Sequence, residues 1–380
     1  MYDLLLKNGR VMDPARDVDA ILDVAFAAGR IARIDTHIAE EAREVRDLKG
    51  AIVTPGLIDL HTHVYWGGTA LGVDPDSLAR QSGCTTLVDA GSAGAGNFIG
   101  MRRHIVEPAK ARVLAYLNVS FAGIFAFSKA VMVGECADVR LLNARECVRV
   151  GREHPDLITG IKVRVGQYAG GASGVAPLDI ALEVAEELGL PVMSHLDFPP
   201  PSRKEVLDRL RSGDVLTHCF RPFPNAPVRT DGAIFDEVLA ARDRGVIFDI
   251  GHGMGSLGFA TARRMLDKGF FPDVISSDVH ALSIEGPAFD LPTTMSKFLC
   301  LGMALPDIVR AVTATPAQAL RRFDLGTLRI GAEGDATVLE IQDGEYPYLD
   351  ALGERFIGDQ RIAPAGMVRA GVWWPTGQAV

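Results

Sequence analysis

The sequence predicts an α/β protein: a (β/α)8 TIM barrel with a small β-sandwich domain built from both chain ends. Short apolar or β-branched segments alternate with amphipathic segments through the middle of the chain. Both ends instead carry short strands punctuated by glycine turns. With 380 residues, 48% of them hydrophobic and 23% charged, the chain can form a large barrel and has the composition of a compact globular protein.

Eight segments of the chain have strand character, at residues 57–63, 85–91, 112–120, 158–165, 190–197, 214–220, 245–253 and 273–280. The stretches between them have helical periodicity, most clearly at residues 177–190, 203–213, 234–245 and 258–269. Eight strand and helix pairs predict a closed barrel, in which catalytic groups lie at the C-terminal ends of the strands. A doubly wound open sheet is the second interpretation, because no G-x-G-x-x-G motif follows a strand.

The barrel is expected to span residues 55–324, flanked by residues 1–54 and 325–380. The short strands of each flank need hydrogen-bonding partners. The simplest arrangement pairs the two ends of the chain with each other in one sandwich domain, with the barrel inserted between them.

Charge and cysteine content limit the possible partners and the compartment. The net charge of −9 comes from acids spread along the chain, without a lysine or arginine block, so we expect no nucleic-acid partner. The N-terminal apolar run contains Asp3 and Lys7 and does not resemble a signal peptide, and no run resembles a membrane helix. Five cysteines without a C-x-x-C pair favour reduced thiols and a cytoplasmic protein.

Polar residues that can bind metals recur late in the predicted strands. His61 and His63 are two apart in "TPGLIDLHTHV", so both rings are expected to project from the same face of the first strand. A lone histidine is more often a packed core residue than a metal ligand. Here, however, the later strands add four more such residues, which are Lys162, His195, His218 and Asp278.

Lys162 is the hardest of these residues to explain by packing. It shares one face of "GIKVRV" with Arg164, and the apolar face of that strand should meet the helices, so Lys162 is expected to point into the barrel. A buried amine there either loses its proton and acts as a Schiff-base nucleophile, or reacts with carbon dioxide to form a carbamate. Four nearby imidazoles favour the carbamate, as an anionic bridge between two divalent metals. A Schiff-base lyase remains the alternative.

This ligand set, H-x-H followed by Lys, His, His and Asp, resembles that of the amidohydrolase superfamily of binuclear metal hydrolases. The resemblance extends from "PGLIDLHTHV" to "GDATVLE". Within the superfamily, "GGTALGVDPD", "GIKVRV" and "SDVHALSIEGPAFDLPTTMSKFLCLGM" resemble a branch often labelled dihydroorotase but similar to deacetylases of acylated α-substituted carboxylic acids.

The resemblance implies a role for each ligand. His61, His63 and Asp278 would hold the more buried of two metal ions, with zinc as the expected metal. His195 and His218 would hold the more exposed ion. A carbon dioxide-derived carbamate on Lys162 would bridge the two ions together with a hydroxide, and Asp278 would also shuttle the proton during catalysis.

The resemblance also implies a substrate. Dihydroorotases usually carry a carboxylate-binding arginine two residues beyond the second histidine, and Tyr65 occupies that position here. We therefore expect deacetylation of N-acetyl or O-acetyl α-amino or α-hydroxy carboxylic acids. Cyclic amide hydrolysis, as in dihydroorotases and hydantoinases, and a non-catalytic barrel homologue are the alternatives.

The expected partner is thus a small molecule with a carboxylate, and a homo-oligomer is the expected assembly. Asp59, two residues before His61, is expected to orient a ligand rather than to bind metal. The candidates for substrate contact follow the first strand, share a face with a predicted ligand or end the seventh strand, and they are Tyr65, Gly67, Gly68, Arg164, His252 and His280.

Overall fold

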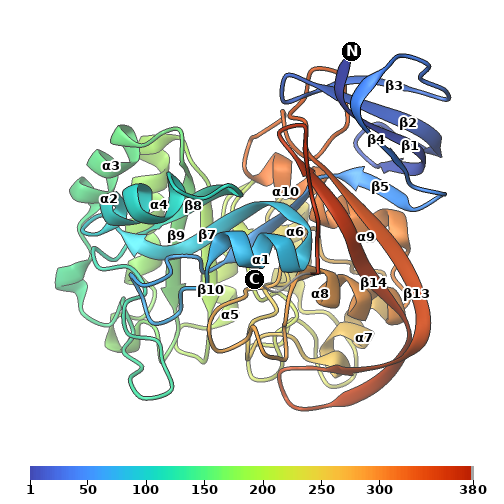
Figure 1. Cartoon of the computed structure of the whole chain (residues 1–380). Coiled ribbons are helices and arrows are strands. Elements are labelled where there is room, and N and C mark those ends of the chain that lie inside the picture. Colours follow the sequence, from blue (N-terminus) through green and yellow to red (C-terminus); the bar gives the residue numbers. More distant parts are fainter. Residues whose placement is uncertain (378–380) are drawn as a thin grey trace.

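A barrel of parallel strands forms the centre of the computed structural model, which describes residues 1–377 (Figure 1). Seven strands pair in chain order, β6 (Leu57–Thr62), β7 (Cys84–Gly94), β8 (Arg112–Asn118), β9 (Ile158–Val165), β10 (Val192–Leu196), β11 (Val215–Leu216) and β12 (Ile247–Phe248). The eighth segment closes the ring through two parallel bridges, Asp249 with Val274 and Thr62 with Val279. The predicted (β/α)8 barrel is confirmed, and its closure excludes the doubly wound open sheet.

The last three barrel segments are less regular than the sequence predicts. β11 and β12 have two residues each, and residues 273–280 make isolated bridges instead of a strand. His218 and Asp278 have positive φ angles of 62° and 47°. Left-handed backbone interrupts a regular β-ladder, so the sixth segment has left its strand at His218 and the eighth pairs only through isolated bridges.

The helices surround the barrel, and an apolar core fills the space between them and the strands. Ile161, Val163 and Val165 of β9 all lie in this outer core, as predicted. The helix expected over residues 203–213 ends at Leu207 instead; farther on, Asp214 accepts a hydrogen bond from Arg211 N that fixes a turn before β11. The helices are α1 (Pro75–Ser82), α2 (Phe98–Met101), α3 (Ala144–Glu153), α4 (Ala176–Leu188), α5 (Arg203–Leu207), α6 (Asp236–Asp243), α7 (Phe259–Asp267), α8 (Leu291–Cys300), α9 (Leu305–Val312) and α10 (Ala314–Ala319).

A second cluster of apolar side chains fills the interior of the barrel. Ile58 and Leu60 of β6 lie in it with side chains of the other strands and of α10. The register of β6 against β7 then shifts between Asp59 and Thr62. In a regular strand, neighbouring residues point to opposite faces. The irregularity interrupts this alternation, so His61 and the preceding Leu60 both face the barrel interior.

Strands from both ends of the chain pair in one eight-stranded sheet among the described residues, so the two flanks come together as predicted, and the bounds of the two domains stay a prediction. β5 links the ends, because it pairs with β1 on one side and with β13 on the other (Figure 1). The strands are β1 (Tyr2–Asp13), β2 (Val18–Ala27), β3 (Arg30–Asp35), β4 (Ala42–Asp47), β5 (Ile52–Pro55), β13 (Ala336–Leu349), β14 (Arg355–Arg369) and β15 (Val372–Trp374). Residues 378–380 of the predicted second flank lie outside the described residues.

Two further sequence predictions concern the surroundings of the protein. Among residues 1–377, no helix combines the length and the apolar character needed to cross a bilayer. All five cysteines are free thiols, and four of them are buried.

Candidate metal centre

A cavity of about 220 Å³ opens at the C-terminal ends of the barrel strands. The six residues predicted as metal ligands, which come from five different barrel segments, all line it: His61, His63, Lys162, His195, His218 and Asp278. A larger groove of about 660 Å³ between α3 and α4 contains none of them. The fold therefore brings the predicted ligands together, and their individual roles stay predictions.

The donor atoms approach one another closely enough to surround an ion. One ligand atom each from His61, His218 and Asp278 lies within 4.8 Å of the others. Asp278 Oδ1 is 3.3 Å from Nε2 of both His61 and His63. Lys162 Nζ is 3.2 Å from His61 Nε2. Imidazole nitrogens and a carboxylate converging in this way match the ligand preference of zinc.

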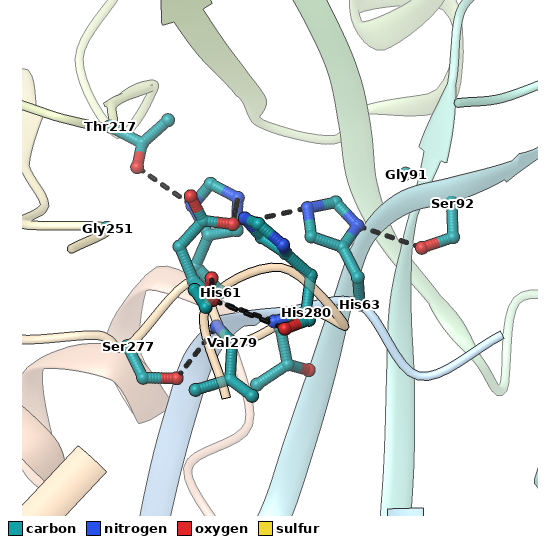
Figure 2. Close-up of polar contacts among 12 residues, drawn as sticks. His61, His63, Gly91, Ser92, Thr217, Gly251, Ser277, Val279 and His280 are labelled. Atoms are coloured by element: carbon teal, nitrogen blue, oxygen red, sulfur yellow. Dashed lines mark hydrogen bonds and ion pairs between the residues drawn. The ribbon is translucent and has the colours of Figure 1, made fainter. Parts of the chain in front are cut away.

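A buried hydrogen-bond chain fixes the orientation of His61. The Thr217 hydroxyl donates to Asp249 Oδ2 at 2.7 Å. Its oxygen is therefore free to accept from His61 Nδ1, 2.9 Å away (Figure 2). This arrangement puts the proton of His61 on Nδ1 and leaves the Nε2 lone pair directed into the cavity, which is the tautomer a metal ligand needs.

The other imidazoles of the first and sixth segments are held in a similar way. His218 Nδ1 is 2.7 Å from the carbonyl oxygen of Gly251, which only accepts, so His218 carries its proton on Nδ1. His63 Nδ1 lies 2.8 Å from the hydroxyl of Ser92 (Figure 2). Each ring thus uses one nitrogen for orientation and turns the other toward the cavity.

His195 provides the test of whether the cavity suits a metal. Its Nε2 atom is buried and has no hydrogen-bond partner among the described residues. Asp197 Oδ2 is the nearest acid, at 3.8 Å. A buried nitrogen without a partner is costly, and a metal ion would satisfy it. The donor set therefore fits divalent metal ions.

Burial also sets the protonation states of the ligands. It lowers the pKa of His63 to about 3. It lowers the pKa values of His61, His195 and His218 as well, so these rings are neutral at physiological pH, as metal binding requires. The pKa of Lys162 falls to about 7, again mainly because the amine is buried. A large fraction of the amine is therefore neutral near pH 7, and the neutral amine is the form that can react with carbon dioxide.

Two glycines make room for the ligands. A Cβ atom on Gly253, whose φ is +51°, would lie 2.2 Å from Asp278 Oδ2. A Cβ atom on Gly91, with φ +86°, would lie 2.6 Å from the Cβ of Lys162. Only glycine tolerates both the left-handed backbone and the close approach at these positions.

The structure divides the predicted substrate contacts into two groups. Arg164 and His280 line the cavity. Leu282 N donates to His280 Nδ1 at 3.1 Å, which leaves the proton of that ring on Nε2.

The remaining four predicted contacts do not line the cavity. The Tyr65 hydroxyl donates to the carbonyl oxygen of Asn97 at 3.2 Å, and its ring packs beside Gly68. Gly67 and Gly68 form a turn that folds back on Tyr65, where the Gly68 N–H donates to Tyr65 O. His252 is fully buried, with Nε2 2.6 Å from Lys297 Nζ. The structure places these four residues outside the cavity lining, and their role as substrate contacts stays a prediction.

Asp59 has the surroundings expected of an orienting residue. Its carboxylate accepts from both the backbone N–H and the hydroxyl of Ser277, at 3.0 and 2.5 Å. Burial raises the pKa of Asp59 to about 7. Ser277 directly precedes Asp278, so Asp59 fixes the segment that presents Asp278 to the cavity.

Several residues that shape the cavity were not predicted from the sequence. Asp197 and Arg221 lie two and three residues beyond a predicted ligand, and this proximity was the available signal. The apolar part of the lining comes from loop residues that the sequence did not single out, and includes Leu71, Ile124, Phe127, Met132 and Met254.

Comparison with known proteins agrees with this geometry. The model of the amidohydrolase family matches residues 52–361. The chain belongs to the amidohydrolase family. It is 36% identical over 327 residues to a deacetylase from Agrobacterium fabrum, a match that covers 86% of this chain and 80% of the relative. As a family member it is a hydrolase that acts on amide bonds.

Two solved structures share the whole architecture. A protein described as an adenine deaminase superposes with a TM-score of 0.92 at 32% identity, over 99% of this chain and 100% of that chain. A protein described as a dihydroorotase superposes with a TM-score of 0.91 at 31% identity, over 100% of this chain and 99% of that chain. These neighbours bear different activity names, so the reaction of this chain has to be argued from its own cavity.

Proposed function

We propose that this protein is a metal-dependent hydrolase that removes the acetyl group from N-acetyl α-amino or O-acetyl α-hydroxy carboxylic acids. The observation that carries the proposal is the cavity in which four imidazoles, Lys162 and Asp278 converge. The similarity to a deacetylase over 86% of the chain supports the choice of the acetyl group.

The six lining residues would hold two divalent metal ions, with zinc suiting the nitrogen-rich donor set. His61, His63 and Asp278 would form one group of ligands, which the equal distance of 3.3 Å from Asp278 Oδ1 to Nε2 of both rings supports. His195 and His218, whose ring centroids are 4.6 Å apart, form the other. Lys162, as a carbamate, would join the two groups. When bound, such ions lower the pKa of water and polarise a carbonyl group.

Asp278 would move the proton. It is the one carboxylate of the six predicted ligands, and its positive φ angle of 47° holds it at the mouth of the barrel. Its carboxylate would accept the proton that the attacking water loses and deliver it to the leaving nitrogen or oxygen. The hydrogen bonds from Ser277 to Asp59 keep this segment in place during the transfer.

The experiment that tests the proposal is a substrate screen of the purified, zinc-loaded protein. Acetate release is measured from acetylated D- and L-amino acids and α-hydroxy acids, with dihydroorotate and hydantoins as the comparison compounds. The proposal predicts acetate release that a chelator abolishes and added zinc restores. Turnover of the cyclic amides without acetate release from any acetylated acid would overturn it in favour of a cyclic amide hydrolase.

A further inference from the structure

Two arginines line the cavity, and they differ in how their charge is balanced. Arg164 Nη1 is 3.3 Å from Glu135 Oε2, and the Glu135 side chain is completely buried. The Arg164 guanidinium also lies over the Phe127 ring, 5.0 Å from its centroid. Arg164 therefore already has an anionic partner within the protein, so its charge does not require a ligand.

Arg221 has no such partner. Its Nη2 donates to the hydroxyl of Ser256 at 2.9 Å, and its Nε is buried without any hydrogen-bond partner. Within residues 1–377, no carboxylate oxygen lies within 4.0 Å of its guanidinium. Burial lowers the pKa of Arg221 to about 10, so it still carries its charge at neutral pH. Asp197 and Asp278 lie near enough to favour its charged form without making an ion pair with it. An arginine kept charged beside a cavity, without a direct ion pair, is poised for an anion that arrives from outside.

The guanidinium is also close to the reaction centre. Arg221 follows His218 by three residues, and its backbone N–H donates to His218 O at 3.0 Å. After burial, nearby positive groups that include Arg221 contribute to lowering the pKa of both His195 and His218. A ligand held by Arg221 would thus place its neighbouring atoms beside the two imidazoles.

The rest of the lining favours a particular kind of anion. Ile124, Phe127, Met132 and Met254 add apolar surface to the same cavity. A molecule that carries a carboxylate beside an apolar side chain would match Arg221 with one part and these residues with the other.

We propose that Arg221, steadied by Ser256, binds the carboxylate of the substrate, and that Arg164 serves the fold through Glu135. This inference rests on the proposed function for the identity of the substrate. It assigns the carboxylate to the segment after β11, and not to the turn after β6, where Tyr65 faces away from the cavity.

The test compares an acid with its neutral counterpart. The enzyme variants Arg221→Met and Arg221→Lys are assayed by kcat/KM on O-acetyl-3-phenyllactate and on its primary amide, for both enantiomers. Because a bidentate contact to a charged group is lost, Arg221→Met should lower kcat/KM for the acid about 100-fold and change that for the amide by less than about threefold. Arg221→Lys keeps the positive charge but lacks the planar guanidinium that can make two parallel hydrogen bonds, so it should retain part of the preference for the acid.

The control removes the other charge pair as a unit. A double variant, Glu135→Gln with Arg164→Gln, should keep the ratio of acid to amide turnover, and circular dichroism checks the folding of every variant. Equal losses for acid and amide in Arg221→Met, or loss of the acid preference in the double variant alone, would overturn the assignment.

A binding measurement keeps the inference separate from the proposed function. Calorimetry measures the affinity of the zinc-loaded protein and of Arg221→Lys and Arg221→Met for 3-phenyllactate and for its amide. Tighter binding of the acid that is lost in Arg221→Met supports the inference even if the protein releases no acetate. Equal affinity of wild type and Arg221→Met for the acid would refute it even if the deacetylase activity is present.

Discussion

The hydrogen-bond chain from His61 through Thr217 to Asp249 gives the sharpest prediction about the metal centre. The substitution Thr217→Val preserves the shape of the side chain and removes the hydroxyl. His61 Nδ1–H then loses its acceptor at 2.9 Å, and Asp249 Oδ2 loses its donor at 2.7 Å. Both side chains are almost completely buried, so water cannot readily replace the hydroxyl.

The size of the effect follows from these contacts. A buried polar group left without a partner costs about 1–3 kcal/mol, and the free energy of unfolding of the metal-free protein should fall by at least that amount. Loss of the partner that orients a ligating histidine typically weakens metal binding by about 10–100-fold. We therefore expect Thr217→Val to lower zinc affinity within that range.

Competition with a chromophoric chelator measures the zinc affinity, and denaturant unfolding of the chelated protein measures the stability. Thr217→Ser is the matched control, because it keeps the hydroxyl and should resemble the wild type in both measurements. If Thr217→Val bound zinc as tightly as the wild type, the tautomer of His61 would not depend on its hydrogen bond to Thr217. The interpretation of His61 as an oriented metal ligand would then be wrong.

Three further predictions concern other residues. Asp278→Asn should lower kcat by about 10²–10⁴-fold through loss of proton transfer; a near wild-type kcat in steady-state assays of the zinc-loaded variant would exclude that role. Lys162→Ala should lose activity that bicarbonate with a short-chain carboxylic acid partly restores, and full activity without additives would refute the bridging carbamate. Burial lowers the pKa of Lys297 to about 7, so above pH 7 the unfolded chain binds a proton that the native protein does not, and the free energy of unfolding should rise with pH toward the ordinary lysine pKa. In denaturant unfolding, the rise in the free energy of unfolding between pH 7 and pH 9 should be smaller for Lys297→Met than for the wild type. An equal rise in both proteins would contradict the lowered pKa of Lys297.

The parts of the site at the C-terminal ends of the barrel strands could be predicted from the sequence. Lys162 was assigned to the interior because its apolar neighbours on β9 needed the helices, and these neighbours do lie in the outer core. His195 and His218 could be placed beside it because the ends of parallel barrel strands meet at one edge. Local periodicity and one topological rule were sufficient for these residues.

The parts of the site that lie beyond the strands could not be predicted in this way. The direction of a loop depends on contacts with distant segments, such as the hydrogen bond from Tyr65 to Asn97 that turns residues 65–68 away from the cavity. Arg221 carried no motif, and what distinguishes it from an ordinary structural arginine is that, among residues 1–377, no carboxylate oxygen lies within 4.0 Å of its guanidinium. The register shift that sets the phase of β6 likewise has no signal in the alternation of its residues.

The most direct test of the central claim is anomalous diffraction from crystals of the zinc-loaded protein. We predict two peaks in the barrel cavity, one beside His61, His63 and Asp278 and one beside His195 and His218, with carbamate density extending from Lys162 Nζ between them. A cavity without anomalous scatterers, in which the Lys162 amine is unmodified under the same conditions, would contradict the claim.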